Sequence, residues 1–216
     1  MRRVFAAVFL ILLLSLTGCS GLTHSSSSTV TTSPQGGNSA TSNSISGLIL
    51  SLSLDSATYQ PGQTVNIEVD EINSLKKTNS VSATRNWSFP GLSVGPCGTL
   101  NYPFGIAIFQ GYYTAGDLSS VTPLKLDNPD AAYPCPMILA DISTYSFQSS
   151  SDSAEVFQLG GVDPVLTETM SAQIHPTGYW TGSPNGELTN FVPGAYTVVA
   201  GDEWGAMVVL HFTISQ

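Results

Sequence analysis

The chain has 216 residues, which is enough for one sizeable domain with additional segments, and only 10% of them are charged. Its 15 acidic residues outnumber its 6 basic residues, for a formal net charge of −9 at pH 7. Because an acidic surface repels phosphate groups and other anions, nucleic acids and anionic ligands are excluded as expected partners.

The N-terminus has the pattern of a cleavable secretory signal. Met1 is followed by two arginines, and an apolar run then extends from Val4 to Leu14. About a dozen apolar residues are too few to cross a bilayer, which takes roughly 20, but they match the apolar region of a signal peptide. We therefore expect this segment to direct export.

A four-residue motif, Leu16-Thr17-Gly18-Cys19, follows the apolar run and resembles the lipobox of prokaryotic lipoproteins. The resemblance implies that residues 1–18 are a lipoprotein signal peptide and that Cys19 becomes the lipidated N-terminal residue. It also implies membrane binding through the acyl chains on Cys19, because each buried methylene adds about 0.8 kcal/mol. The expected location is the cell envelope, at the outer face of the cytoplasmic membrane or in the outer membrane and periplasm. The alternative is an ordinary secretory signal with a cysteine nearby by chance.

Residues 19–46 differ in composition from the rest of the chain. About half of the residues from Ser20 to Ser46 are Ser or Thr, and none is charged. Since this segment has no apolar face to bury, we expect a disordered tether between the lipidated Cys19 and a folded domain at residues 47–216.

The region from residue 47 onward has the two-residue periodicity of β-strands. Leucines alternate with other residues from Leu48 to Leu54, and apolar and polar residues alternate from Val65 to Asp70. We find no convincing helical periodicity, so the pattern predicts an all-β fold, an antiparallel sandwich of short strands separated by turns. Further strands are expected at Val81–Phe89, Phe104–Phe109, Met137–Ile142, Ala154–Leu159, Val165–Ile174, Gly178–Thr181, Ala195–Ala200 and Ala206–Ser215.

Two segments of this region resemble immunoglobulin-like (Ig-like) and fibronectin type III-like domains. Phe191–Val198 contains a Pro-Gly-x-Tyr-x-Val pattern similar to the entry to their penultimate strand, and Leu54–Val65 is similar to the first turn of bacterial Ig-like modules. The resemblance implies an Ig-like sandwich with a tyrosine corner, in which the Tyr196 hydroxyl bonds back to the main chain. Residues 47–216 number 170, whereas an Ig-like sandwich needs about 100, so a large insertion is expected at about 90–187.

The chain has three cysteines, and lipidation of Cys19 would leave Cys97 and Cys135. In an oxidising compartment we expect these two to form a disulfide, worth roughly 4 kcal/mol in chain-entropy terms. The competing interpretation is a metal site, but neither cysteine lies in a CxxC motif or near a histidine. No metal and no cofactor is therefore expected.

The catalytic motifs in the sequence are weak, and we expect no enzymatic activity. Gly91–Gly95 matches the G-x-S-x-G nucleophile elbow, but that motif requires a following helix, and Pro96 and Gly98 disfavour one. His175 and His211 lie in the folded region without the spacing of a copper site.

Several aromatic residues lie next to turns, where adjacent side chains on a strand cannot both face the core. Exposed aromatic rings stack on sugars or anchor protein partners, so these residues are candidate ligand contacts. The alternative is that they cover the core and the inserted loops. They are Tyr112, Tyr113, Tyr179, Trp180 and Trp204.

Three functions remain open from the sequence. The first is a lipid-anchored, extracytoplasmic Ig-like module that is not catalytic and binds a protein or glycan partner in the cell envelope. The second is an Ig-like proteinase inhibitor with an inhibitory segment around Gly91–Cys97. The third is a surface hydrolase with its active-site residues in the inserted region.

Overall fold

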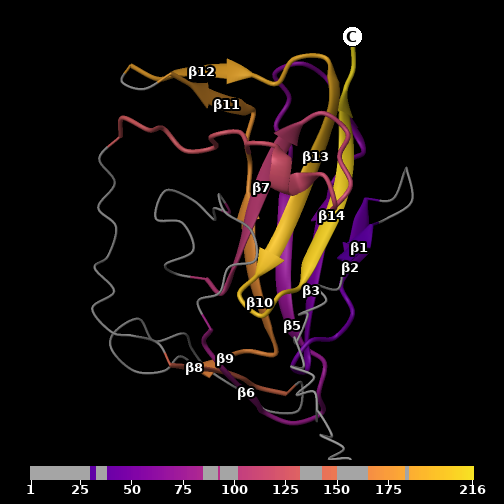
Figure 1. The fold of residues 1–216 in the computed structure, drawn as a ribbon, viewed down its shortest axis with the longest axis vertical. Coiled ribbons are helices and arrows are strands. Elements are labelled where there is room, and N and C mark those ends of the chain that lie inside the picture. Colours follow the sequence, from indigo (N-terminus) through magenta and orange to yellow (C-terminus); the bar gives the residue numbers. More distant parts are fainter. Residues whose placement is uncertain are drawn as a thin grey trace, which may run out of the picture.

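The structure is a computed structural model, and it describes residues 30–32, 38–84, 92, 102–131, 143–149, 165–182 and 185–216. Within these ranges the chain forms strands and turns, with one short 3-10 helix, η2 (Leu118–Ser120), and no α-helix. No helix of the described part is long and apolar enough to cross a membrane. The predicted all-β class is confirmed (Figure 1).

Two main sheets form the body of the domain, as the sandwich prediction requires. The first has the order β1 (Val30–Thr32), β14 (Met207–Ile214), β13 (Gly194–Asp202) and β7 (Phe104–Gln110), and β4 (Thr58–Tyr59) also pairs with β14. The second has the order β10 (Thr169–Ile174), β5 (Ile67–Asn73), β3 (Leu48–Leu54) and β2 (Ser39–Thr41). Pairing within the main sheets is antiparallel except for β1 and β4, which run parallel to β14.

Two small sheets lie at opposite ends of the sandwich (Figure 1). One is the hairpin of β11 (Gly178–Thr181) and β12 (Glu187–Asn190), near the C-terminus. The other joins β6 (Asn79–Ser82), β8 (Thr144–Phe147) and β9 (Val165–Leu166). We call the end with the β11–β12 hairpin the upper end and the end with the β6-β8-β9 sheet the lower end.

The core lies between the two main sheets and is filled by residues at every second position of their strands. In β3 and β5 burial alternates along the whole strand, so Leu50 and Val69 point inward while Ser51 and Asp70 do not. Strands β13 and β14 contribute residues such as Tyr196, Val198 and Leu210 from the other side. The alternation of apolar and polar residues along these strands is therefore typical of sheets that bury one face.

Strand β7 is buried on both faces. One face contributes Phe104, Ile106 and Ile108 to the main core. The other face packs beneath the segment that follows the strand, in a second cluster formed by Ala107, Phe109, Leu118, Val199, Met207 and Val209. Residues 111–121 thus cover part of the outer face of the first sheet.

The folded region begins earlier than predicted. Strand β2 pairs with β3, and the main-chain N–H of Leu50 donates to the hydroxyl of the buried Ser42 at 3.0 Å. Strand β1 pairs with β14, with Val30 opposite Met207. The predicted tether boundary at residue 46 is therefore wrong. A Ser/Thr-rich segment adds edge strands through main-chain hydrogen bonds, which do not require an apolar face.

The predicted insertion at about 90–187 contains parts of the main sheets. Strand β7 pairs with β13, from Phe104 opposite Asp202 to Gln110 opposite Tyr196. Strand β10 pairs with β5 along its whole length. The additional residues are therefore not one continuous insertion, because the strands they contain complete both sheets.

Some expected strands differ in extent or are not described. The stretch expected at Val165–Ile174 forms two strands, β9 and β10, because the chain bends at Glu168 between them. The expected strand at Val81–Phe89 is represented by β6, which ends at Ser82. Trp87 and Phe89, at the end of that expected strand, lie outside the described residues. The same is true of the strands expected at Met137–Ile142 and Ala154–Leu159.

Candidate functional site

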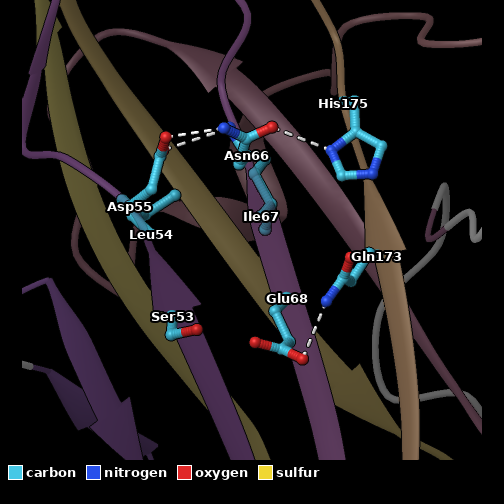
Figure 2. A pocket seen from close by; sticks show the side chains of 8 residues that line it. All are labelled: Ser53, Leu54, Asp55, Asn66, Ile67, Glu68, Gln173 and His175. Carbon is cyan, nitrogen blue, oxygen red and sulfur yellow. Dashed lines mark hydrogen bonds between the residues drawn. The ribbon is translucent and has the colours of Figure 1, made fainter.

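The outer face of the second sheet carries a polar groove near the upper end, where β3 ends, β5 begins and β10 ends (Figure 2). The groove encloses about 250 Å³. We use the name polar groove for the eight residues that line it, which are Ser53, Leu54, Asp55, Asn66, Ile67, Glu68, Gln173 and His175.

Strand register arranges the polar side chains of the groove in two rows. In the first row Ser53 is opposite Glu68, and Glu68 is opposite Gln173. The second row consists of Asp55, Asn66 and His175, each two residues along its segment from a member of the first row. Because residues two apart on a strand share a face, both rows lie on the outer face while Leu54 and Ile67 are buried between them.

The second row is a chain of hydrogen bonds that starts in the core. The buried Tyr59 hydroxyl donates to Asp55 Oδ1 at 2.6 Å, and the Asn66 side-chain nitrogen donates to Asp55 Oδ2 at 2.6 Å. Since that nitrogen is the donor, the Asn66 side-chain oxygen accepts from His175 Nδ1 at 2.9 Å. Nδ1 is therefore the ring nitrogen that donates in this hydrogen bond.

The first row is also internally hydrogen-bonded. Gln173 Nε2 donates to Glu68 Oε1 at 3.0 Å. Just beyond the groove on the same face, the Ser171 hydroxyl donates to the Asp70 carboxylate. These bonds hold the side chains in place before a ligand binds, which lowers the entropy lost on binding.

The groove contains a carboxylate that ionises readily. Desolvation acts to raise the pKa of Asp55, but the hydrogen bonds donated by Tyr59 and Asn66 outweigh it and leave the pKa below its ordinary value. Burial, and then the adjacent Asp55 carboxylate, raise the pKa of Tyr59 above its ordinary value. Tyr59 is therefore a fixed hydrogen-bond donor, and Asp55 is a carboxylate at neutral pH.

The chemistry of the groove suits reversible binding of a polar ligand. It offers carboxylate, amide, imidazole and hydroxyl groups, and none of its lining residues is a lysine or arginine. Such groups bond hydroxyls and amides, while the two carboxylates repel anions. Across the described ranges, no group of three His, Cys, Asp or Glu side chains is placed to hold a metal ion.

The aromatic candidates predicted from the sequence lie outside this groove and in separate places. Tyr112 is 51% exposed and stacks on His211 of β14, with ring centroids 3.8 Å apart and an interplanar angle of 8°. Tyr179 and Trp180 lie in β11, where Tyr179 packs against Phe191 and the Trp180 main-chain N–H donates to the Lys125 carbonyl.

Tyr113 belongs to a clamp that fixes the segment after β7 to the first sheet. The buried Thr197 hydroxyl donates to the Gly111 carbonyl at 2.8 Å and accepts from the Tyr113 N–H at 2.9 Å. His211 Nε2 donates to the Tyr113 carbonyl at 2.9 Å. Gly111 has a φ of +122°, and a Cβ there would lie 2.8 Å from the Tyr113 ring. The position therefore requires glycine.

Trp204 is a packing residue at the lower end. Its indole N–H donates to the Ser82 carbonyl at 2.9 Å. Its ring makes edge-on contacts with Tyr145 and Phe147 of β8, at centroid distances of 5.6 Å and 6.2 Å. Trp204 thus joins the β13–β14 turn to the β6-β8-β9 sheet.

Tyr196 bonds back to the main chain four residues upstream. Its hydroxyl donates to the Val192 carbonyl at 2.9 Å and accepts from the Val192 N–H at 3.0 Å. The ring is fully buried and stacks on Phe212 with centroids 5.1 Å apart. Desolvation raises the pKa of Tyr196. These contacts hold the entry to β13 against β14.

Three carboxylic acids are buried near the lower end, namely Glu71, Asp202 and Glu203. Burial, and then the nearby Asp202, raise the pKa of Glu71 well above its ordinary value. Burial also raises the pKa of Asp202 to about 6, although hydrogen bonds from main-chain N–H groups, including those of Ala206 and Trp204, act in the opposite direction. Neither oxygen of Glu71 has a hydrogen-bond partner among the described residues.

Other predicted sites lie outside the described residues. They include the lipidation site Cys19 and the expected disulfide between Cys97 and Cys135. The segment Gly91–Cys97, considered as an inhibitory loop, is described only at Leu92, which packs against the second cluster.

The groove is not among the sites predicted from the sequence, although the sequence contains one local signal of it. Asp55 and Asn66 flank the turn at Gln60–Gln63, and Asn66 and Glu68 occupy outward positions in the alternation that starts at Val65. Nothing local indicated that Gln173 and His175 lie beside them, because that placement depends on the pairing of β10 with β5.

A scan of protein-family models finds no family that matches this chain, and neither the curated proteins nor the solved structures show a match to it.

Proposed function

We propose that this protein is a lipid-anchored, extracytoplasmic and non-catalytic module whose β-sandwich binds a glycan or protein partner in the cell envelope through the polar groove. The observation that carries the proposal is the two rows of polar side chains where β3 and β10 end and β5 begins. Hydrogen bonds link Asp55, Asn66 and His175 in one row. In the other row Gln173 bonds Glu68, and Ser53 is opposite Glu68. The lipobox-like motif that ends at Cys19 supports the anchor and the location.

Of the two partner classes, the groove favours a glycan. Planar carboxylate, amide and imidazole groups bond the neighbouring hydroxyls of a sugar ring, and the two rows provide five such side chains on one face. The ligand is expected to be neutral or cationic, because Asp55 and Glu68 repel anionic groups. A protein partner would use the same chemistry through hydroxyl, amide or basic side chains.

The first experiment tests the groove. The exported chain carrying Cys19→Ser is titrated with fragments of envelope polysaccharide and with envelope protein extracts by calorimetry. Asn66→Ala and Gln173→Ala should each weaken binding about tenfold, because each removes side-chain hydrogen bonds in the rows. Gln110→Ala is the matched control, since it removes an exposed amide from β7 in the other sheet and should leave binding unchanged.

Two results would contradict the proposal. Binding by the unchanged chain that neither groove variant weakens would place the ligand elsewhere on the domain. If the unchanged chain bound neither the polysaccharide nor the protein fractions, the proposed binding function would be refuted. A separate experiment tests the anchor: a clickable fatty acid fed to cells should label the wild-type protein and leave the Cys19→Ser variant unlabelled.

A further inference from the structure

We propose that a glycan held in the polar groove also stacks on the indole ring of Trp180, which the β11–β12 hairpin presents at the same end of the sandwich (Figure 1). This inference rests on the proposed binding function of the groove. It adds a second contact, for the apolar face of a sugar ring, and it names an oligosaccharide of several residues as the ligand.

The two faces of the β11–β12 hairpin have different surroundings. Tyr179 packs against the buried Phe191, with ring centroids 6.2 Å apart, so its side of the hairpin faces the core. Trp180 is the next residue along β11, and its side chain therefore points to the opposite face. Leu188 lies directly opposite Trp180 in the strand register and is 47% exposed. Neither Trp180 nor Leu188 is among the described residues that pack against a core cluster.

A third residue extends this pair into a row. Lys125 forms a β-bridge with Trp180 on the other side of β11, and the Trp180 main-chain N–H donates to the Lys125 carbonyl at 2.8 Å. Lys125 is exposed, whereas its neighbours Leu124 and Leu126 pack against the core. Because residues opposite each other in a sheet share a face, Lys125, Trp180 and Leu188 lie together on the outward face of the hairpin. We call these three residues the hairpin row.

Main-chain contacts hold the hairpin in place before a ligand binds. A two-stranded hairpin by itself is only marginally stable in water, so its shape depends on these contacts. In its turn, the Gly186 N–H donates to the Asp130 carboxylate, and at its base the Phe191 N–H donates to the Thr177 carbonyl at 3.2 Å. A surface that is fixed in this way loses less entropy when a ligand binds to it.

The hairpin row has the chemistry of a surface that binds a sugar ring. The flat indole covers the apolar C–H face of such a ring, and Leu188 widens the apolar surface. The Trp180 indole N–H donates to none of the described residues, and the Lys125 ammonium offers further donors to sugar hydroxyls. The exposed carboxylates of Asp130 and Glu187 flank the hairpin turn, so this surface does not attract anionic polymers.

The hairpin row lies within reach of the polar groove. His175 lines the groove, and Trp180 follows it by 180 − 175 = 5 residues. A fully extended chain spans at most about 3.6 Å per residue, so the two Cα atoms are no more than about 18 Å apart. The Val65 N–H, just before β5, donates to the Pro176 carbonyl at 2.9 Å and ties this connection to the second sheet. An oligosaccharide of several residues spans such a separation, whereas a single sugar does not.

The size of the row favours a glycan over a protein partner. A stable protein interface takes roughly 20 residues or more on each side. The hairpin row instead presents one aromatic ring with a leucine and a lysine beside it, which matches one sugar ring.

Substitutions at Trp180 separate stacking from packing. The exported chain carrying Cys19→Ser is titrated by calorimetry with size-fractionated neutral fragments of envelope polysaccharide. Trp180→Ala and Trp180→Leu should each weaken binding about tenfold, whereas Trp180→Phe, which keeps a flat aromatic ring, should weaken it about threefold or less. Tyr112→Ala is the matched control, because it removes an exposed aromatic ring that stacks on β14 of the other sheet, and it should leave binding unchanged.

Tryptophan fluorescence gives a second measurement. Saturating fragments should shift the emission of the chain with Trp180 intact. Trp180→Phe should lose this shift while calorimetry still detects binding, because Trp87 and Trp204 remain as the other two indoles. Urea unfolding of Trp180→Ala should give the wild-type midpoint, since the ring packs against neither core cluster.

The outcomes distinguish this contact from the groove itself. Fragment binding that Asn66→Ala weakens and Trp180→Ala does not would overturn the stacking contact and leave the proposed function intact. Weakening by Trp180→Ala alone would support the stacking contact and refute the role of the groove. Binding of envelope proteins without binding of any polysaccharide fragment would refute the hairpin row as a glycan contact.

Discussion

Glu71 of β5 and Asp202 of β13 place two carboxyl groups in the same buried region between the main sheets. Glu71 is 0% exposed and Asp202 is 1% exposed. Asp202 accepts hydrogen bonds from the N–H groups of Trp204 and Ala206 at 2.9 Å and 2.7 Å. Its electrostatic effect is to disfavour ionisation of Glu71. A buried carboxyl without donors is most stable in its neutral form, so this pair makes the fold sensitive to pH.

The pair should destabilise the domain as pH rises. The folded pKa of Asp202 is raised from 3.8 to about 6, so its contribution to stability is fully present below about pH 4 and is lost as pH rises toward 6. The rise in the pKa of Asp202 from 3.8 to about 6 corresponds to roughly 3 kcal/mol. The raised pKa of Glu71 acts in the same direction. Urea unfolding followed at pH 4 and pH 7.5 measures the effect.

Glu71→Gln should therefore stabilise the domain at pH 7.5 by at least about 1 kcal/mol and reduce the pH dependence, because the amide has no charge to bury. Asp70→Asn is the matched control. Asp70 is the next residue, points to the outer face and bonds Ser171, and its substitution should change the free energy of unfolding little. Equal stability of Glu71→Gln and wild type at pH 7.5 would show that Glu71 is not a buried charge.

Tyr196→Phe should destabilise the domain by about 1–2 kcal/mol, because it leaves the Val192 N–H and carbonyl without the partner that the hydroxyl provides. Thermal or urea unfolding measures the change. Tyr112→Phe provides the comparison, since Tyr112 is 51% exposed, and its loss of a hydroxyl should leave stability within about 0.5 kcal/mol of wild type. Equal effects of the two substitutions would be inconsistent with a stabilising role for the Tyr196 hydroxyl.

Thr197→Val should loosen the segment that covers the outer face of the first sheet. The substitution keeps the side-chain shape but removes both bonds of the clamp, to the Gly111 carbonyl and the Tyr113 N–H. The cost should be about 1–3 kcal/mol, and hydrogen exchange at Tyr113 should accelerate. Exchange in β3, on the opposite sheet, serves as the internal reference. An unchanged Tyr113 amide would contradict the clamp.

A chain that begins at residue 47 should be less stable than one that begins at residue 29. The shorter chain lacks β1 and β2, which pair with β14 and β3, and it loses the Ser42 hydroxyl that Leu50 N–H bonds. We expect a lower urea midpoint and faster exchange at Leu50 in the shorter chain. Identical midpoints would mean that the two edge strands add no stability.

The all-β class, β3 and the β13–β14 hairpin were predictable from the sequence. The period of two in Leu48–Leu54 is a local property, because each residue's inward or outward direction follows from its position along one strand. The apolar stretches on either side of the Gly201–Gly205 turn are likewise short-range signals, and they form β13 and β14. The lipidation of Cys19 and the Cys97–Cys135 disulfide stay predictions from the same kind of local evidence.

Only the tertiary structure decided which distant segments meet. Gln173 bonds Glu68 across a separation of 105 residues, and Glu71 meets Asp202 from another sheet. The polar β1 and β2 became strands because free sheet edges were available to pair with, a condition that their own composition does not encode. Alternation specifies which face of a strand is buried, but the neighbour of each strand depends on long-range main-chain pairing. The polar groove is a product of that pairing.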